Sequence, residues 1–185
     1  MVKDALRETE DRMKGALKSL EESLATVRTG RASPALVEKL PVEYYGTPTP
    51  LMQLATISAP ESRLLTIKPF DATSIKTIEK AILASDLGLN PSNDGKLIRL
   101  AIPPLTEERR RDLIKVVHHR LEEARVAVRN VRRDVHNDLR DFEKEKLISE
   151  DELKRGEDEL QKLTDRYVEL MEAVGKKKEE EIKQI

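Results

Sequence analysis

Residues 106–147 read TEERRRDLIKVVHHRLEEARVAVRNVRRDVHNDLRDFEKEKL. Apolar residues recur in this stretch every three or four positions, at Leu113, Val117, Leu121, Ala124, Val128, Val131, Val135, Leu139 and Phe142. That period places them on one face of an α-helix. Thr106 is a suitable N-cap, and no proline interrupts the run. The stretch therefore predicts a single helix of roughly 60 Å, at about 1.5 Å per residue.

Two further helices are expected on either side of this one. The N-terminal segment has apolar residues at heptad-like spacing and is expected to stop at Gly30: Leu6, Met13, Leu17, Leu20, Leu24 and Val27. Ser149 and Glu152 form a capping box that opens the last helix. Its expected apolar face is Leu153, Leu160, Leu163, Tyr167, Leu170 and Val174. Three narrow apolar faces bury one another in a three-helix bundle, built from residues 1–30 and 105–185.

Residues 31–104 interrupt the bundle with a different pattern, rich in proline and β-branched residues. Strands are predicted at 42–45, 51–58, 63–68 and 96–102. A helix is expected from Ser74 to Gly88, with Ile75, Ile78 and Ile82 facing inward, and Asn93-Asp94-Gly95 is a turn signal. The fold class is therefore α+β: a long three-helix bundle with a small inserted β/α/β domain. The two crossings, near 29–33 and 103–106, are expected hinges, marked by Gly30, Pro103 and Pro104.

Composition excludes several classes of protein. The 185 residues contain no cysteine, so disulfides, thiolate metal sites and a cysteine nucleophile are excluded. No run of apolar residues approaches the roughly 18 needed to span a membrane, and the acidic N-terminus does not resemble a signal or transit peptide. We therefore expect a soluble cytoplasmic protein. The net charge of −1 conceals a basic segment, 106–140, with ten basic and seven acidic residues, and an acidic one, 141–185, with ten and fifteen.

A basic stripe follows the apolar face of the long helix. It consists of Arg125, Arg129, Arg132, His136 and Arg140, each one residue after an apolar-face position, and Arg133 widens it. Such residues often pair with acids on neighbouring bundle helices. Alternatively, arginine is well suited to phosphate, and Asp134 is the one acid near the centre of the stripe. Both interpretations stay open at this point.

Other kinds of site find little support. His118, His119 and Glu122 form no HExxH motif, so no metal site is expected. Seven glycines form no phosphate-binding loop, and no nucleophile elbow is present, so the chain is not expected to be an enzyme. Five scattered aromatic residues provide no stacking platform for bases. Any RNA binding should therefore rely on phosphates and shape.

Several segments, in this order, resemble the ribosome recycling factor family over essentially the whole chain. They are RTGRASP (28–34), VEYYGTPTPL (42–51), ASDLGLNP (84–91), PPLTEERR (103–110) and ARVAVRNVRRD (124–134). The resemblance implies an L-shaped protein that binds large-subunit RNA of the post-termination ribosome. It implies elongation factor G as a partner, which hydrolyses GTP and splits the subunits, so the chain itself needs no cofactor. The family's RNA-contacting arginines correspond here to Arg28, Arg31, Arg110, Arg129, Arg132 and Arg133.

We further expect a monomer that does not bind membranes. Three alternatives remain: a structural coiled-coil protein, a small enzyme of unfamiliar type, and another ribosome-binding factor, such as a dormancy or assembly factor. The first should self-associate, the second needs a pocket with a perturbed titratable group, and the third should bind ribosomes without splitting them.

Overall fold

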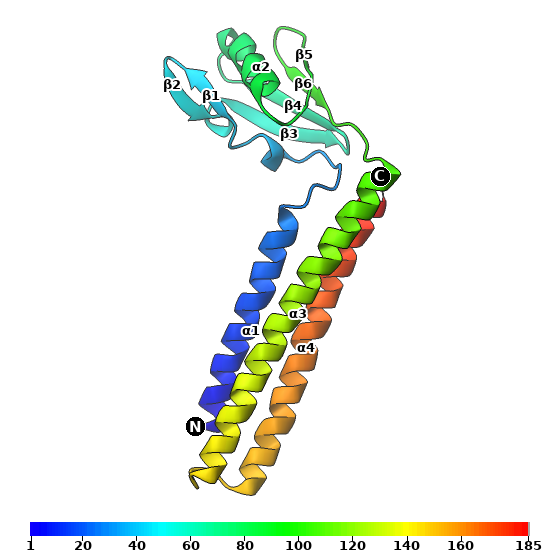
Figure 1. The fold of residues 1–185 in the computed structure, drawn as a ribbon. Coiled ribbons are helices and arrows are strands. Elements are labelled where there is room, and N and C mark those ends of the chain that lie inside the picture. The colour runs from blue at the N-terminus through cyan, green and yellow to red at the C-terminus, as the bar shows by residue number, and fades with distance from the viewer. Residues whose placement is uncertain (185) are drawn as a thin grey trace. The chain divides into compact units, whose positions relative to one another are not determined.

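The computed structural model describes residues 1–184 and shows an α+β protein whose chain forms two compact units (Figure 1). The first unit contains residues Met1–Arg28 and Glu107–Gln184, and the second contains Thr29–Thr106. The last residue of the segment expected for the bundle, Ile185, lies outside the described residues.

Three long helices lie side by side in the first unit: α1 (Val2–Ala25), α3 (Glu107–Lys144) and α4 (Glu150–Lys183) (Figure 1). Contacts along the helices give their directions. Arg12 in the middle of α1 meets Asp134 late in α3, whereas Thr26 after the end of α1 meets Arg120 earlier in α3, so these two helices are antiparallel. At 38 residues, α3 is about 57 Å long.

The apolar face predicted for α3 is confirmed. Eight of its nine predicted residues are buried, and the ninth, Phe142, is half-buried. The capping box before α4 is confirmed as well. The N–H of Ser149 donates to Oε2 of Glu152 at 2.8 Å, and the N–H of Glu152 donates to Oγ of Ser149 at 3.2 Å. The hydrogen bond from the backbone N–H of Ser149 to the carboxylate favours the ionised form and lowers the pKa of Glu152.

The apolar face predicted for α4 is partly wrong. Leu160 and Tyr167 are buried as predicted, but Leu170 is 40% exposed, and Leu163 and Val174 are only half-buried. The buried residues of this helix are instead Gly156, Leu160, Thr164, Tyr167, Met171, Gly175 and Ile182. The two glycines explain the difference, because a Cβ atom at Gly175 would lie 3.0 Å from Cδ2 of Leu121. Helix α4 therefore approaches α3 on a face that hydrophobicity alone does not reveal.

Helix α1 ends earlier than predicted. Its last residue is Ala25, and Gly30, which has a φ of 77°, lies outside the helix. One C-terminal carbonyl group of α1 has a partner in α3, because Nη1 of Arg120 donates to the carbonyl of Ser23 and also to Oγ1 of Thr26. A side chain of the neighbouring helix therefore contributes to the end of α1, where a glycine cap had been predicted.

The second unit starts with a hairpin. Strands β1 (Pro41–Tyr44) and β2 (Thr47–Pro50) pair in antiparallel fashion across Tyr45 and Gly46, whose φ angles are 47° and 78°. Two consecutive positive φ angles match the twist of a two-residue hairpin turn. The strand at 42–45 was predicted but β2 was not, because its two prolines argue against a strand unless it lies at an edge.

A four-stranded antiparallel sheet forms the rest of this unit, in the order β3-β4-β6-β5. The strands are Ala55–Glu61 (β3), Leu64–Pro69 (β4), Pro91–Asn93 (β5) and Ile98–Ala101 (β6). Helix α2 (Ile75–Ala84) packs against β1 and β5, with the three predicted isoleucines buried. The strand predicted at 51–58 begins late because Leu51–Gln53 is a 3₁₀ turn, and β5 was missed. Gly88 does not close α2, which ends at Ser85.

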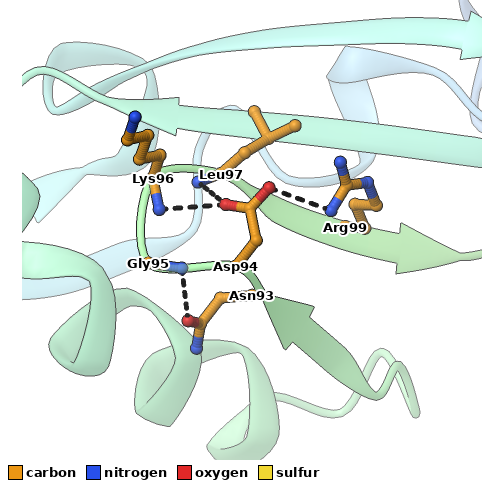
Figure 2. A network of polar contacts seen from close by, with 6 residues as sticks. All are labelled: Asn93, Asp94, Gly95, Lys96, Leu97 and Arg99. Carbon is orange, nitrogen blue, oxygen red and sulfur yellow. Dashed lines mark hydrogen bonds and ion pairs between the residues drawn. The ribbon is translucent and has the colours of Figure 1, made fainter.

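The predicted turn after β5 is confirmed, and Figure 2 shows how it is held. Oδ1 of Asp94 accepts hydrogen bonds from the N–H groups of Lys96 and Leu97 at 3.0 and 2.9 Å. These bonds lower the pKa of Asp94. Oδ1 of Asn93 accepts from the N–H of Gly95 at 3.0 Å, and Gly95 adopts a φ of 89°, which glycine tolerates best. The tip is therefore ordered by its own side chains.

Candidate nucleic-acid interface

The two ends of the basic stripe pair with acids of α4. Nη1 of Arg125 lies 3.8 Å from Oε1 of Glu172. Nε2 of His136 and Nε of Arg140 lie 3.0 and 3.7 Å from Oε1 of Glu157. At these positions the stripe does what flanking residues of a bundle usually do, which is to join two helices.

The centre of the stripe is different, because its arginines meet neutral groups or a shared acid. Arg129 contacts Glu122 of its own helix at 2.6 Å, and Glu122 also lies 3.4 Å from Arg125. Nη1 of Arg132 donates to Oε1 of Gln161 at 3.0 Å. Arg133 donates to the amide oxygen of Asn130. Neither Arg132 nor Arg133 forms an ion pair within residues 1–184.

Asp134, the one acid near the centre of the stripe, pairs with a residue of another helix. Oδ2 of Asp134 lies 3.2 Å from Nη2 of Arg12, a residue of α1. Asp134 therefore pairs with a cation of the neighbouring helix, and Arg132 and Arg133 have no ion-pair partner among the described residues. This arrangement favours the phosphate interpretation for the centre of the stripe, while the ends follow the bundle interpretation.

A groove of about 330 Å³ runs beside these arginines. Its lining comes from α3 and α4: Arg129, Arg132, Arg133, His136, Glu157, Leu160 and Gln161. Leu160 is buried, so the bottom of the groove is part of the bundle core, whereas the three arginines are exposed. Guanidinium groups on a rigid rim can donate to phosphate oxygens of an RNA backbone without reading its bases.

The remaining candidate arginines lie elsewhere. Arg28 is exposed at the end of the first unit, and Arg31 is exposed in the second unit. Arg110 is half-buried, and its Nε atom is buried without a hydrogen-bond partner within residues 1–184. It precedes Arg132 by 22 residues of α3, which corresponds to roughly 33 Å along the helix. The structure thus brings together Arg129, Arg132 and Arg133, but not Arg110.

Sequence reasoning missed Gln161, the partner of Arg132. It also missed the anchors of the two crossings, which are backbone hydrogen bonds to the second unit. The N–H of Ala32 donates to the carbonyl of Ser62 at 2.7 Å, and the N–H of Ile102 donates to the carbonyl of Arg63 at 2.8 Å. Both anchors belong to the turn between β3 and β4. No pattern in the sequence indicates such backbone contacts, because every residue type can make them.

Other kinds of site receive no geometric support from the described residues. His118 lies 3.3 Å from Glu179, which also pairs with Lys183, and His119 lies 3.0 Å from Glu123. In residues 1–184, no three histidine, aspartate or glutamate side chains are grouped so that they could hold a metal ion. No described helix is both long and apolar enough for a transmembrane span.

Comparison with known proteins gives a consistent result. The family model described as "Ribosome recycling factor" matches residues 20–182. The ribosome-recycling factor of Roseiflexus castenholzii is 58% identical over 185 residues, covering 100% of both chains. A solution structure of the ribosome recycling factor has a TM-score of 0.74 and 46% identity, and covers 100% of this chain and 98% of the other.

A second solved structure is a model of the T. thermophilus ribosome recycling factor and the E. coli elongation factor G bound to the E. coli post-termination complex. It matches with a TM-score of 0.63 and 49% identity over 98% of both chains. The family model covers most of the chain, and the curated relative covers all of it. The chain therefore belongs to the ribosome recycling factor family.

Proposed function

We propose that this protein binds the post-termination ribosome and, together with elongation factor G, separates it into subunits. The three-helix bundle is the part that holds the ribosome, chiefly through large-subunit RNA. The observation that supports this assignment is the centre of the stripe, where Arg132 and Arg133 hydrogen-bond to the neutral side chains of Gln161 and Asn130 and form no ion pair within residues 1–184. The related structure on the E. coli post-termination complex supports the choice of partner.

The RNA surface acts through charge and shape. Arg129, Arg132 and Arg133 lie within about one turn of α3, beside its buried apolar face. Phosphate contacts of this kind release counterions, so binding should weaken steeply as salt concentration rises. Arg28, Arg31 and Arg110 are proposed as additional RNA contacts at other positions of the chain. No base-specific reading is proposed, since the aromatic residues are few and the groove is lined by charged side chains.

The two crossings act as hinges. The first is held at Thr26 by Arg120, at Val27, which is buried and donates its N–H to the carbonyl of Leu24 at 3.0 Å, and again at Ala32 by Ser62, so residues 28–31 lie between these anchors. The second is held at Ile102, and residues 103–105 follow before the N-terminal end of α3. Gly30, Pro103 and Pro104 fall within these short segments, where few contacts oppose a change of backbone angles.

Replacing Gly30 by valine tests the hinge. The φ of 77° strains any β-branched residue, so the crossing must adopt another path. We expect Gly30→Val to bind ribosomes as the natural protein does but to split them more slowly. A matched control is Gly15→Val in α1, which changes the same side chain far from the crossings, at a position with open space. Equal splitting by the natural protein and Gly30→Val would argue against the hinge.

The chain contributes binding and mechanics rather than bond chemistry. Energy for splitting comes from GTP hydrolysis by elongation factor G, so the protein needs no cofactor of its own. We propose that it works as a monomer in the cytoplasm and does not engage membranes. Purified protein should therefore show no nucleotide hydrolysis, and its sedimentation should correspond to one chain of 21.1 kDa.

Light scattering of purified post-termination ribosomes tests the function. The protein, elongation factor G and GTP are omitted in turn, and we expect scattering to fall only when all three are present. Binding without loss of scattering, seen by co-sedimentation, would assign the protein to another ribosomal role. Neither binding nor splitting would leave a structural helical bundle as the remaining interpretation.

A further inference from the structure

Gln161 of α4 lies between a cation and an anion. Its Oε1 accepts a hydrogen bond from Nη1 of Arg132 at 3.0 Å, and its Nε2 donates to Oδ1 of Asp165 at 2.8 Å. A guanidinium group can only donate hydrogen bonds, and a carboxylate can only accept them. The two partners therefore fix which way the amide points, with its carbonyl toward Arg132.

The geometry assigns Gln161 a role as a positioning residue of the RNA interface, an inference that rests on the proposed function. The amide carbonyl orients the guanidinium of Arg132 on the rim of the groove. Because the amide is neutral, it leaves the full positive charge of Arg132 available to a phosphate. The same amide binds Asp165 through its Nε2 atom, so it contacts Arg132 with its neutral carbonyl and Asp165 with its N–H group.

Neighbouring positions of α4 show what the alternative looks like. Glu157, one turn before Gln161, lies against His136 and Arg140, and Glu172 lies against Arg125. At both of these places a carboxylate of α4 pairs with residues of the stripe and so joins α4 to α3. Gln161 faces the stripe between them and differs from glutamate by one terminal group. That single difference decides whether Arg132 is neutralised or only held in place.

The substitution Gln161→Glu tests this role directly. It should convert the hydrogen bond into an ion pair at nearly the same distance, without changing the volume of the side chain. We expect ribosome affinity to fall roughly tenfold and the salt dependence of binding to become shallower by about one phosphate contact. We expect the Tm to change little, because the new pair joins α3 to α4 while the new carboxylate loses the hydrogen bond to Asp165 and repels it. A loss of fold alone would lower both affinity and Tm.

Gln184→Glu provides the matched control. It makes the same chemical change at the exposed end of the same helix, outside the groove. It lowers the net charge of the chain by one unit, as Gln161→Glu does. We expect its affinity for ribosomes to equal that of the natural protein. If both variants lost affinity equally, the loss would reflect net charge, and the positioning role of Gln161 would be wrong.

A double substitution separates this inference from the proposed function. Arg132→Ala should weaken ribosome binding, and adding Gln161→Glu to it should have little further effect, since Gln161 acts through Arg132. If Arg132→Ala weakens binding but Gln161→Glu alone does not, only the role of Gln161 is refuted. An undiminished effect of Gln161→Glu in the Arg132→Ala background also refutes it. If Arg132→Ala binds normally, the RNA surface itself is misplaced, and the role of Gln161 falls with it.

Discussion

Arg125 and Arg132 belong to one stripe of one helix, yet the structure predicts that replacing them has opposite consequences. Arg125 is 32% exposed and reaches Glu122 at 3.4 Å and Glu172 at 3.8 Å, the second of which ties α3 to α4. Arg132 is exposed and contacts the neutral Gln161. Arg125→Ala should therefore destabilise the bundle, whereas Arg132→Ala should weaken ribosome binding.

The expected magnitudes follow from these contacts. Two partly exposed ion pairs and the packing of the aliphatic stem are worth about 1 kcal/mol together for Arg125. In a chain of this size, that corresponds to a fall in Tm of roughly 2–4 °C. Removing the exposed Arg132 should change the free energy of unfolding by less than about 0.5 kcal/mol. Losing its hydrogen bonds to a phosphate should cost about 1.5–3 kcal/mol of binding, or roughly 10- to 150-fold in affinity.

Two measurements on the same protein samples test the pair. Thermal unfolding by circular dichroism gives the Tm, and co-sedimentation with purified ribosomes at two salt concentrations gives the affinity and its salt dependence. Arg125→Ala should lower the Tm and leave affinity within about twofold, because its charge is already balanced. The reasoning is refuted if Arg132→Ala lowers the Tm as much as Arg125→Ala does, since Arg132 would then be a bundle contact.

Three further substitutions test the bundle. Tyr167→Phe should lower the Tm at neutral pH, because the hydroxyl of Tyr167 donates to Glu10 at 3.1 Å. Burial, with help from Glu10, raises the pKa of Tyr167. The stabilisation by this hydroxyl is therefore present below the ordinary tyrosine pKa near 10 and is lost as the pH rises through the raised pKa. In Tm measurements from about pH 8 to pH 11, the difference between the natural protein and Tyr167→Phe should shrink. Gly175→Val should lower the free energy of unfolding by about 2 kcal/mol and the Tm by roughly 4–8 °C, because its Cβ would lie 3.0 Å from Leu121. An unchanged Tm would show that α3 and α4 can separate at no cost. Gly15→Ala, where the space is open, should instead raise the free energy of unfolding by about 0.5–1 kcal/mol in urea titration.

Much of the fold follows from periodicity in the sequence. The apolar face of α3 was predicted correctly because its residues are all clearly apolar and repeat without interruption. The face of α4 was predicted only in part, since Gly156 and Gly175 contribute to it through small size rather than hydrophobicity. The small size of these glycines matters only because α3 lies so close to α4. The distance between the two helices is a property of the packed bundle, and the sequence of one helix does not reveal it.

The candidate site shows a similar limit. The stripe itself can be read from spacing, because residues three and four apart share a helix face. Which arginines stay uncompensated depends on which residue of α4 lies opposite each one. A shift of α4 by one turn would place Glu157, instead of Gln161, near Arg132 and would remove the free charge. That register is set by core packing between the helices, so the sequence left both interpretations of the stripe open.

In the proposed function the two interpretations apply to different parts of the same stripe, and energetics explains why they can coexist. An exposed arginine without an ion pair is well hydrated, and forgoing the pair costs a bundle only a few tenths of a kcal/mol to about 1 kcal/mol. The stability of the bundle comes instead from its buried apolar faces, which lie one residue away on α3. Charge at Arg132 and Arg133 can therefore be reserved for RNA with little effect on folding. If these groups bind the ribosome as proposed, a rigid helix holds them in place beforehand, which reduces the entropy lost on binding.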